Sequence, residues 1–281
     1  MNVLLIASLT IRESSRRRLL VTIAAATLVL VALTAWAFHA LATVHGTDGK
    51  PVDHYSILVA ASTIEILMAF MFSFVLALSA SFLGGLSTGN EIENGTLLAI
   101  VPRPIRRAEI IVGKWLGNVI LIAGYALIVA WCEFGVVWLI TGYLPPHPAR
   151  ATGFLIAQST LLLTLTMTLS VRLSALASGF TTVVLFGIAW IGGITGSVAA
   201  VLHNASLQSA VAILSLIVPS DGLWRAASFS MQPVLMAAAS QADVNPLTPA
   251  APPPPAYFVW CLLWVLAVLA FGVRSFQTRD I

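Results

Sequence analysis

Ionisable residues that could bind a partner or carry protons occur in two settings in this chain. The first is the stretch 87–114, which holds seven charged side chains: Glu91, Glu93, Arg103, Arg106, Arg107, Glu109 and Lys114. Carboxylates and guanidinium groups make charge-assisted hydrogen bonds to groups of opposite charge, so this stretch has the chemistry of a protein-docking surface. The second setting is a pair of isolated carboxylates, Glu65 and Glu133, each surrounded by apolar sequence.

The familiar catalytic motifs of soluble enzymes do not occur in the sequence. It contains no GxSxG nucleophile motif, no HExxH zinc motif and no GxxxxGK[ST] phosphate-binding loop. We therefore expect the chain to be a non-enzymatic subunit that binds no metal and no cofactor of its own. If the protein does driven work, the nucleotide chemistry must lie on another chain.

The composition indicates an integral membrane protein. Hydrophobic residues make up 59% of the 281 residues and charged residues only 9%, whereas soluble domains carry about 25% charged residues. Apolar runs recur that are long enough for the roughly 30 Å hydrocarbon layer of a bilayer. We expect an all-α fold, in which the whole chain forms one transmembrane domain.

Six segments are predicted to cross the membrane as helices, with boundaries good to a few residues. Their ranges are 19–42, 56–86, 110–140, 151–171, 175–202 and 257–273. The charged residues 87–109 then form a connection between the second and third spans. Glu65 and Glu133 lie within those two spans, at a similar depth below the outer boundary.

The two carboxylates within the spans have more than one interpretation. An ionised carboxylate at this depth costs several kcal/mol unless it is paired or faces water. Glu65 and Glu133 could line a translocation path or contact a substrate, or they could carry protons. Alternatively each is protonated, or is hydrogen-bonded to a neighbouring helix through hydroxyls such as those of Tyr125, Thr160, Thr164 and Thr166.

The distribution of Lys and Arg predicts the orientation of the chain. Six spans place both termini and residues 87–109 on one side of the membrane, and 11 of the 14 basic residues fall there. The positive-inside rule assigns that side to the cytoplasm. The basic character of the chain, with a pI of about 9.2, is thus a topology signal, and we expect no binding to nucleic acid.

Three further segments carry structural predictions. Residues 1–18 end in Arg16, Arg17 and Arg18 and suit a helix lying along the inner membrane surface, or else an extension of the first span. Residues 203–256 on the outside are interrupted at Pro219–Gly222, which favours a re-entrant helical hairpin. Gly192 and Gly196 have the GxxxG spacing that lets helices pack closely. Both cysteines fall within spans and are expected to be buried thiols.

The stretch from the end of the second span into the third resembles the permease subunits of ATP-binding-cassette transporters of the ABC type-2 class. The order of the family pattern is an acidic pair, Gly-Thr, an apolar turn, proline, a basic pair and Gly-Lys. This chain has, in that order, Glu91, Glu93, Gly95, Thr96, Leu97, Pro102, Pro104, Arg106, Arg107, Gly113 and Lys114. The tail around Phe276, Arg279 and Asp280, and the segment from Pro219 to Arg225, are similar to the family's C-terminal end and outer re-entrant region.

The resemblance implies a permease in a prokaryotic cell (inner) membrane, paired with a second copy of itself and with two copies of a separate ATPase that binds ATP and Mg²⁺. It implies that the ATPase contacts the cytoplasmic connection, through Glu91, Glu93, Gly95, Thr96, Arg103, Pro104, Arg106 and Arg107. We expect ATP-driven export by alternating access. The competing hypothesis is a secondary transporter or channel that moves protons through Glu65 or Glu133.

Overall fold

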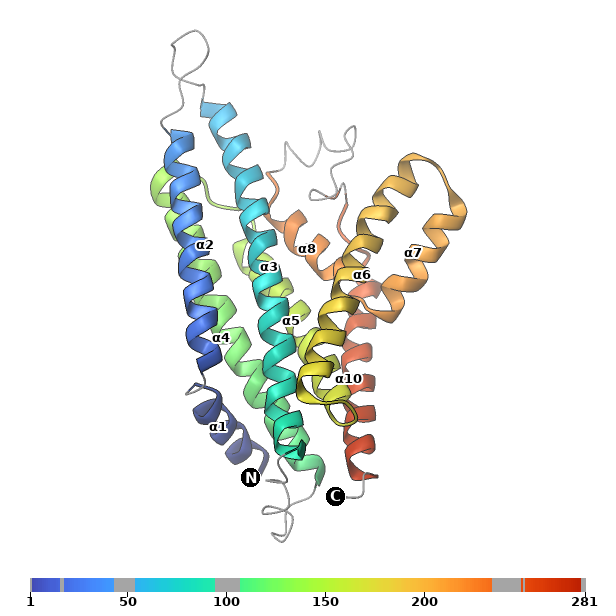
Figure 1. Cartoon of the computed structure of the whole chain (residues 1–281). Coiled ribbons are helices and arrows are strands. Elements are labelled where there is room, and N and C mark those ends of the chain that lie inside the picture. The colour runs from blue at the N-terminus through green and yellow to red at the C-terminus, as the bar shows by residue number, and fades with distance from the viewer. Residues whose placement is uncertain are drawn as a thin grey trace.

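A computed structural model describes residues 2–15, 18–42, 54–93, 107–233, 249 and 251–278, and within these ranges every regular element is a helix (Figure 1). The helices are α1 (Asn2–Ser15), α2 (Arg18–Ala42), α3 (His54–Glu93), α4 (Arg107–Thr141), α5 (Pro148–Ser170), α6 (Ala175–Val201), α7 (Ala205–Ile217), α8 (Asp221–Met231) and α10 (Pro255–Gln277). The predicted all-α class is confirmed for this part of the chain.

Five helices in the described ranges are long and apolar enough to cross a membrane: α3, α4, α5, α6 and α10. They correspond to the second to sixth predicted spans. The predicted first span coincides with α2, which is 25 residues long. The chain is therefore a multi-pass membrane protein, and the six-span layout remains a prediction.

Helices α3 and α4 extend beyond the predicted spans into the charged connection. Helix α3 continues past Leu86 to Glu93, and α4 begins at Arg107. At 1.5 Å per residue, the 40 residues of α3 make a rod of about 60 Å, much longer than the hydrocarbon layer. Part of the predicted connection is thus a direct continuation of two spanning helices.

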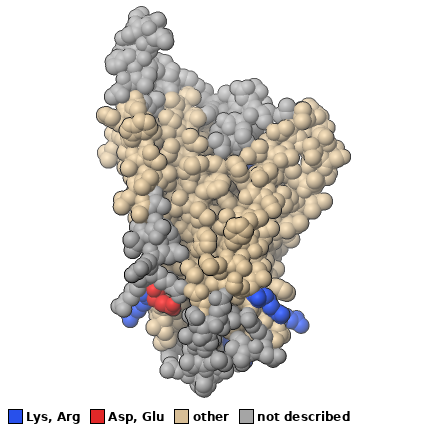
Figure 2. Space-filling model, in the orientation of Figure 1, with Lys and Arg blue, Asp and Glu red and all other residues tan. Residues whose placement is uncertain are grey.

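The bundle has a charged end and an apolar body. The start of α1, the end of α3, the start of α4 and the end of α10 lie at the same end of the molecule (Figure 1). In the view of Figure 2, the visible charged side chains of the described residues gather at that end, and the surface above them shows none. This arrangement fits a bundle whose body is embedded in lipid and whose charged end reaches the aqueous boundary.

Helix α3 is the centre of the bundle, because it packs against α2, α4, α5, α6 and α8. Its aromatic side chains fill the space between these neighbours. Phe70 lies 5.3 Å from the ring of Trp224 on α8, and Phe74 lies 5.1 Å from the ring of Phe186 on α6. A movement of α3 must therefore displace side chains on several other helices.

The N-terminal helix α1 packs against α4. Ala7 and Thr10 are buried on that side, whereas Leu4, Leu5 and Leu9 are exposed. An exposed leucine face at the charged end is compatible with a helix lying along the membrane surface, and both interpretations of residues 1–18 remain predictions.

The outer segment differs from the predicted hairpin in geometry. Helices α7 and α8 are separated by Val218–Ser220 and meet at a bend of 97°, so they form a right-angle elbow instead of an antiparallel pair. The reason lies in their partners, since α7 packs on α6 while α8 packs on α5. No residue of α7 is buried, whereas most of α8 is.

One minor prediction is wrong. Cys261 is buried as expected, but Cys132 on α4 is exposed. Sequence position within a span does not determine which face of the helix points inward.

Candidate functional site

At the charged end, α3 and α4 are joined by buried polar side chains. The Lys114 ammonium donates a hydrogen bond of 2.7 Å to the backbone carbonyl of Ser87, and the Asn118 amide donates one of 2.7 Å to the Ser87 hydroxyl. Lys114 is 7% exposed and Asn118 is fully buried. Buried polar groups are strong constraints on packing, because breaking such a bond leaves a desolvated group unpaired. We call Ser87, Lys114 and Asn118 the α3–α4 lock.

At the same end, glycines let α3 pack closely against α5 and α6. A Cβ on Gly84 would lie 3.1 Å from Leu163 on α5, and one on Gly89 would lie 2.9 Å from the Cβ of Ala175 at the start of α6. A Cβ on Gly85 would collide with the carbonyl oxygen of Ala175. The charged end of α3 therefore contacts α4, α5 and α6 at close range, so it cannot slide independently of them.

Helix α1 is held on α4 by a second pair of glycines. A Cβ on Gly113 would lie 2.8 Å from the Cβ of Ile6, and one on Gly117 would lie 2.7 Å from the carbonyl oxygen of Ala7. The N-terminal helix thus belongs to the same packed unit as the α3–α4 lock.

Most of the predicted ATPase-coupling residues lie outside the described residues. These are Gly95, Thr96, Arg103, Pro104 and Arg106. Glu91 and Glu93 are on the last turns of α3, but their side chains are not described, and Arg107 is the first residue of α4. The structure therefore places the two ends of the predicted coupling connection, both of which are helical.

Glu65 on α3 and Glu133 on α4 are both buried, at 3% and 5% exposure. They lie on neighbouring helices, since α3 packs against α4. One carboxylate oxygen of each, Oε2 of Glu65 and Oε1 of Glu133, is buried without a hydrogen-bond partner in the described part of the chain. Tyr143, in the loop after α4, is buried and donates a hydrogen bond of 2.7 Å to the Met231 carbonyl, and burial first and the charge of Glu65 second raise its pKa.

The hydroxyls that could have bonded these carboxylates are engaged elsewhere. The Tyr125 hydroxyl pairs with the Thr27 hydroxyl on α2. Thr164 accepts from the Trp115 indole at 2.8 Å, and Thr166 donates to Thr182 at 2.8 Å. Each of these bonds joins two helices, so the hydroxyls stabilise the bundle rather than the carboxylate pair.

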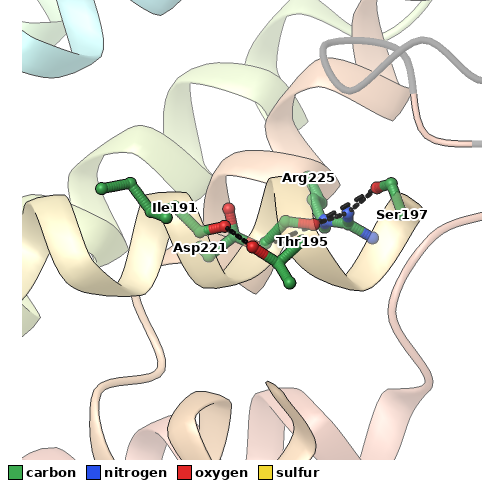
Figure 3. Close-up of polar contacts among 6 residues, drawn as sticks. Ile191, Thr195, Ser197, Asp221 and Arg225 are labelled. Atoms are coloured by element: carbon green, nitrogen blue, oxygen red, sulfur yellow. Dashed lines mark hydrogen bonds and ion pairs between the residues drawn. The ribbon is translucent and has the colours of Figure 1, made fainter. Parts of the chain in front are cut away.

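At the other end of the bundle, an ion pair fixes the elbow onto α6. Arg225 contacts Asp221 at 3.1 Å, and its guanidinium donates to the Gly193 carbonyl at 2.8 Å and to the Ser197 hydroxyl (Figure 3). A Cβ on Gly193 would collide with the Asp221 carboxylate. Arg225 thus binds one residue of its own helix and two of α6, which positions the start of α8.

Gly192 and Gly196 lie where α6 meets α7. A Cβ on Gly192 would collide with Leu214, and one on Gly196 would lie 2.9 Å from Val211. The GxxxG spacing thus coincides with a close helix contact inside one chain.

Within the described residues, no three His, Cys, Asp or Glu side chains gather in a way that could hold a metal ion.

Sequence reasoning missed Ser87, Asn118 and the glycines at 84, 85 and 89. The signal was present, because Gly85 and Gly89 have the same spacing as Gly192 and Gly196. Nothing in the sequence, however, shows that Ser87 meets Lys114, 27 positions away.

Comparison with protein-family models identifies the family of this chain. A family model described as "ABC-2 family transporter protein" covers residues 87–281. No curated protein matches the chain. The matched region begins at Ser87 and therefore includes all three residues of the α3–α4 lock, the predicted coupling connection and the elbow.

Proposed function

We propose, from the premise that this chain belongs to the ABC-2 transporter family, that it is the membrane-spanning permease subunit of an ATP-driven exporter. Membership makes it a transport component of an ABC transporter. The finer assignment concerns the direction of transport, the source of energy and the route by which that energy arrives.

The observation that carries the proposal is the α3–α4 lock. Energy delivered to residues 94–106 would reach the membrane through the helices on either side, α3 and α4. Because Ser87 is bonded to both Lys114 and Asn118, a push on the connection would move the two helices as one body. The glycine contacts of α3 with α5 and α6 would spread that movement through the bundle.

The partners in this proposal follow from the family. Two copies of a separate ATPase would bind ATP and Mg²⁺ and would contact the connection through Glu91, Glu93 and the arginines 103, 106 and 107. Two copies of the permease would enclose the translocation path, with α3 and α6 facing it. Both termini and the connection would be cytoplasmic, in the inner membrane of a prokaryotic cell.

The acidic and basic groups of the connection support a docking role. Carboxylates and guanidinium groups form stronger hydrogen bonds than neutral groups do, and removal of one partner of a desolvated charge pair costs several kcal/mol of binding. Reversing a single charge at this contact should therefore weaken assembly.

Copurification with the candidate ATPase tests the proposal. Glu93→Arg and Arg106→Glu should each reduce recovery of the ATPase and the coupled ATP hydrolysis. A control, Arg274→Glu, changes an exposed arginine at the same end but outside the connection. Unchanged assembly and unchanged hydrolysis in both connection variants would contradict the proposal.

One observation favours a second candidate, a proton-coupled transporter. Glu65 and Glu133 have buried carboxylate oxygens with no partner among the described residues, as a proton-carrying pair would. This candidate predicts pH-driven flux from the purified chain alone in liposomes, abolished by Glu65→Gln or Glu133→Gln. It leaves the α3–α4 lock and the charged connection without a role.

A further inference from the structure

A long groove runs between α5 and α10 on the membrane-facing surface. It has a volume of about 560 Å³. Ala157 and Leu161 line the α5 side, Leu262 and Leu266 line the α10 side, and a Cβ added to Gly153 would meet nothing within 4 Å. The space in front of Gly153 is therefore open and bordered by hydrocarbon side chains.

The outer end of the groove carries a positive charge. Arg150, in the first turn of α5, lines the groove there and is exposed. In the described part of the chain its guanidinium has neither an ion-pair nor a hydrogen-bond partner. A cation at the boundary, with its donors unused, is suited to an anionic headgroup.

The polar side chains along the groove are already paired. The Thr160 hydroxyl donates to the Ile156 carbonyl at 2.8 Å, and the Trp115 indole donates to Thr164 at 2.8 Å. The interior thus offers dispersion contacts but no free donor or acceptor from these two groups. A ligand that fits must be apolar along its length and anionic at one end.

The dimensions of the groove match one leaflet. Arg150 and Leu161 are separated by about 16 Å along α5 at 1.5 Å per residue, which is about half of the roughly 30 Å hydrocarbon layer. Helix α10 is the least covered of the five spanning helices, with 11% of its apolar window buried. Its groove side is therefore open to lipid.

We propose that this groove is a binding site for an anionic phospholipid of the outer leaflet, with an acyl chain along Gly153 and Ala157 and the phosphate on Arg150. A basic residue near the bilayer surface attracts an anionic lipid by about 1 kcal/mol, which corresponds to roughly fivefold in affinity. A lipid with no net charge would make the same apolar contacts but would lack this electrostatic attraction to Arg150. The inference rests on the proposed orientation, with both termini in the cytoplasm, but not on the proposed ATP coupling.

Native mass spectrometry of the purified full chain tests the site, with phosphatidylglycerol and phosphatidylcholine of identical acyl chains as the probes. The wild-type chain should retain phosphatidylglycerol roughly fivefold more strongly. Arg150→Gln should remove this preference and Arg150→Lys should keep it. Equal retention of the two lipids, or a preference that survives Arg150→Gln, would overturn the proposal.

A matched pair of variants tests the place of the acyl chain. Gly153→Leu fills the groove and should abolish the retained lipid, whereas Gly187→Leu on α6, where a Cβ also meets nothing within 4 Å, should not. Quenching by phosphatidylglycerol with brominated acyl chains should fall in Trp115→Phe, because Trp115 lines the groove. If Gly153→Leu instead splits a dimer into monomers, a second copy occupies the groove and the proposal is wrong.

Discussion

The buried ammonium of Lys114 on α4 donates a 2.7 Å hydrogen bond to the Ser87 carbonyl on α3. In the sequence, these two residues flank residues 94–106 of the charged connection. The bond fixes the end of α3 to the start of α4. A force applied to the connection is therefore shared by both helices, rather than bending one against the other.

Replacing Lys114 by Met should weaken this coupling more than the fold. Methionine keeps the length of the side chain but loses the charged donor, whose hydrogen bond is worth about 1.5–3 kcal/mol. Part of this loss is offset because the variant no longer has a charge to bury. We expect an unfolding free energy lower by about 1–2 kcal/mol and a fall of about fivefold or more in substrate transported per ATP hydrolysed. Reconstituted complexes with transport and hydrolysis measured together would check this.

The control for this experiment is Arg274→Met, which removes an exposed positive charge near the same end of the bundle. It should leave the transport-to-hydrolysis ratio unchanged. A normal ratio in Lys114→Met would show that the lock does not transmit force.

Gly89→Ala should destabilise the bundle because the new Cβ would lie 2.8 Å from the Cα of Ala175. Backbone cannot move aside as a flexible side chain does, so the cost should be about 1–3 kcal/mol. Gly135→Ala on α4, where a Cβ meets nothing within 4 Å, should instead be neutral or stabilise by up to about 1 kcal/mol, through its better helix propensity. Equilibrium unfolding in mixed micelles measures both, and equal effects would contradict the packing argument.

The sequence was sufficient to predict the membrane class, the order of the long apolar helices and the positions of Glu65 and Glu133 within two of them. Apolar length and the few charges carry that information directly, because a spanning helix must be about 20 residues long whatever it packs against. The sequence predicted an interruption at Pro219, but it did not predict the right angle between α7 and α8. That angle depends on α7 and α8 packing on different helices.

The α3–α4 lock could not be predicted, for a physical reason. In a span that is apolar all round, periodicity does not show which side faces a neighbour, so rotation about the helix axis is undetermined. Lys114 was recognised only as part of a family pattern, and Cys132 was expected to be buried although it is exposed. Contacts between distant segments, such as those of Arg225 with Gly193 and Ser197, can be predicted only when the rotation of both helices about their axes is known.

Glu133→Gln tests whether the carboxylate pair works in transport. Glutamine has the shape of a protonated glutamate and cannot ionise, so it removes a buried charge that costs several kcal/mol in a bilayer. If export is driven by ATP, we expect transport to be retained and the unfolding free energy to be unchanged or higher by about 1 kcal/mol. Loss of transport in Glu133→Gln, together with pH-driven flux from the wild-type chain alone, would favour the proton-coupled candidate.

The network around Arg225 predicts unequal effects of its members on stability. Arg225→Met should cost about 1–3 kcal/mol, because it removes the contacts to Asp221, the Gly193 carbonyl and Ser197 and leaves the carboxylate partly buried without its cation. Ser197→Ala should cost less, about 0.5–1.5 kcal/mol, since one hydrogen bond is lost. The two effects should not add in the double variant, where a coupling energy of about 0.5 kcal/mol or more is expected for contacting residues.

Thr195→Val is the control for this cycle. Thr195 lies beside the network in Figure 3, but its hydroxyl donates only to the Ile191 carbonyl of its own helix, at 2.8 Å. Since that carbonyl keeps its place in the helical hydrogen-bond pattern, the variant should change the unfolding free energy by less than about 0.5 kcal/mol. Full additivity of Arg225→Met and Ser197→Ala would mean that the elbow is held on α6 by packing alone, and that the guanidinium contacts do not position α8.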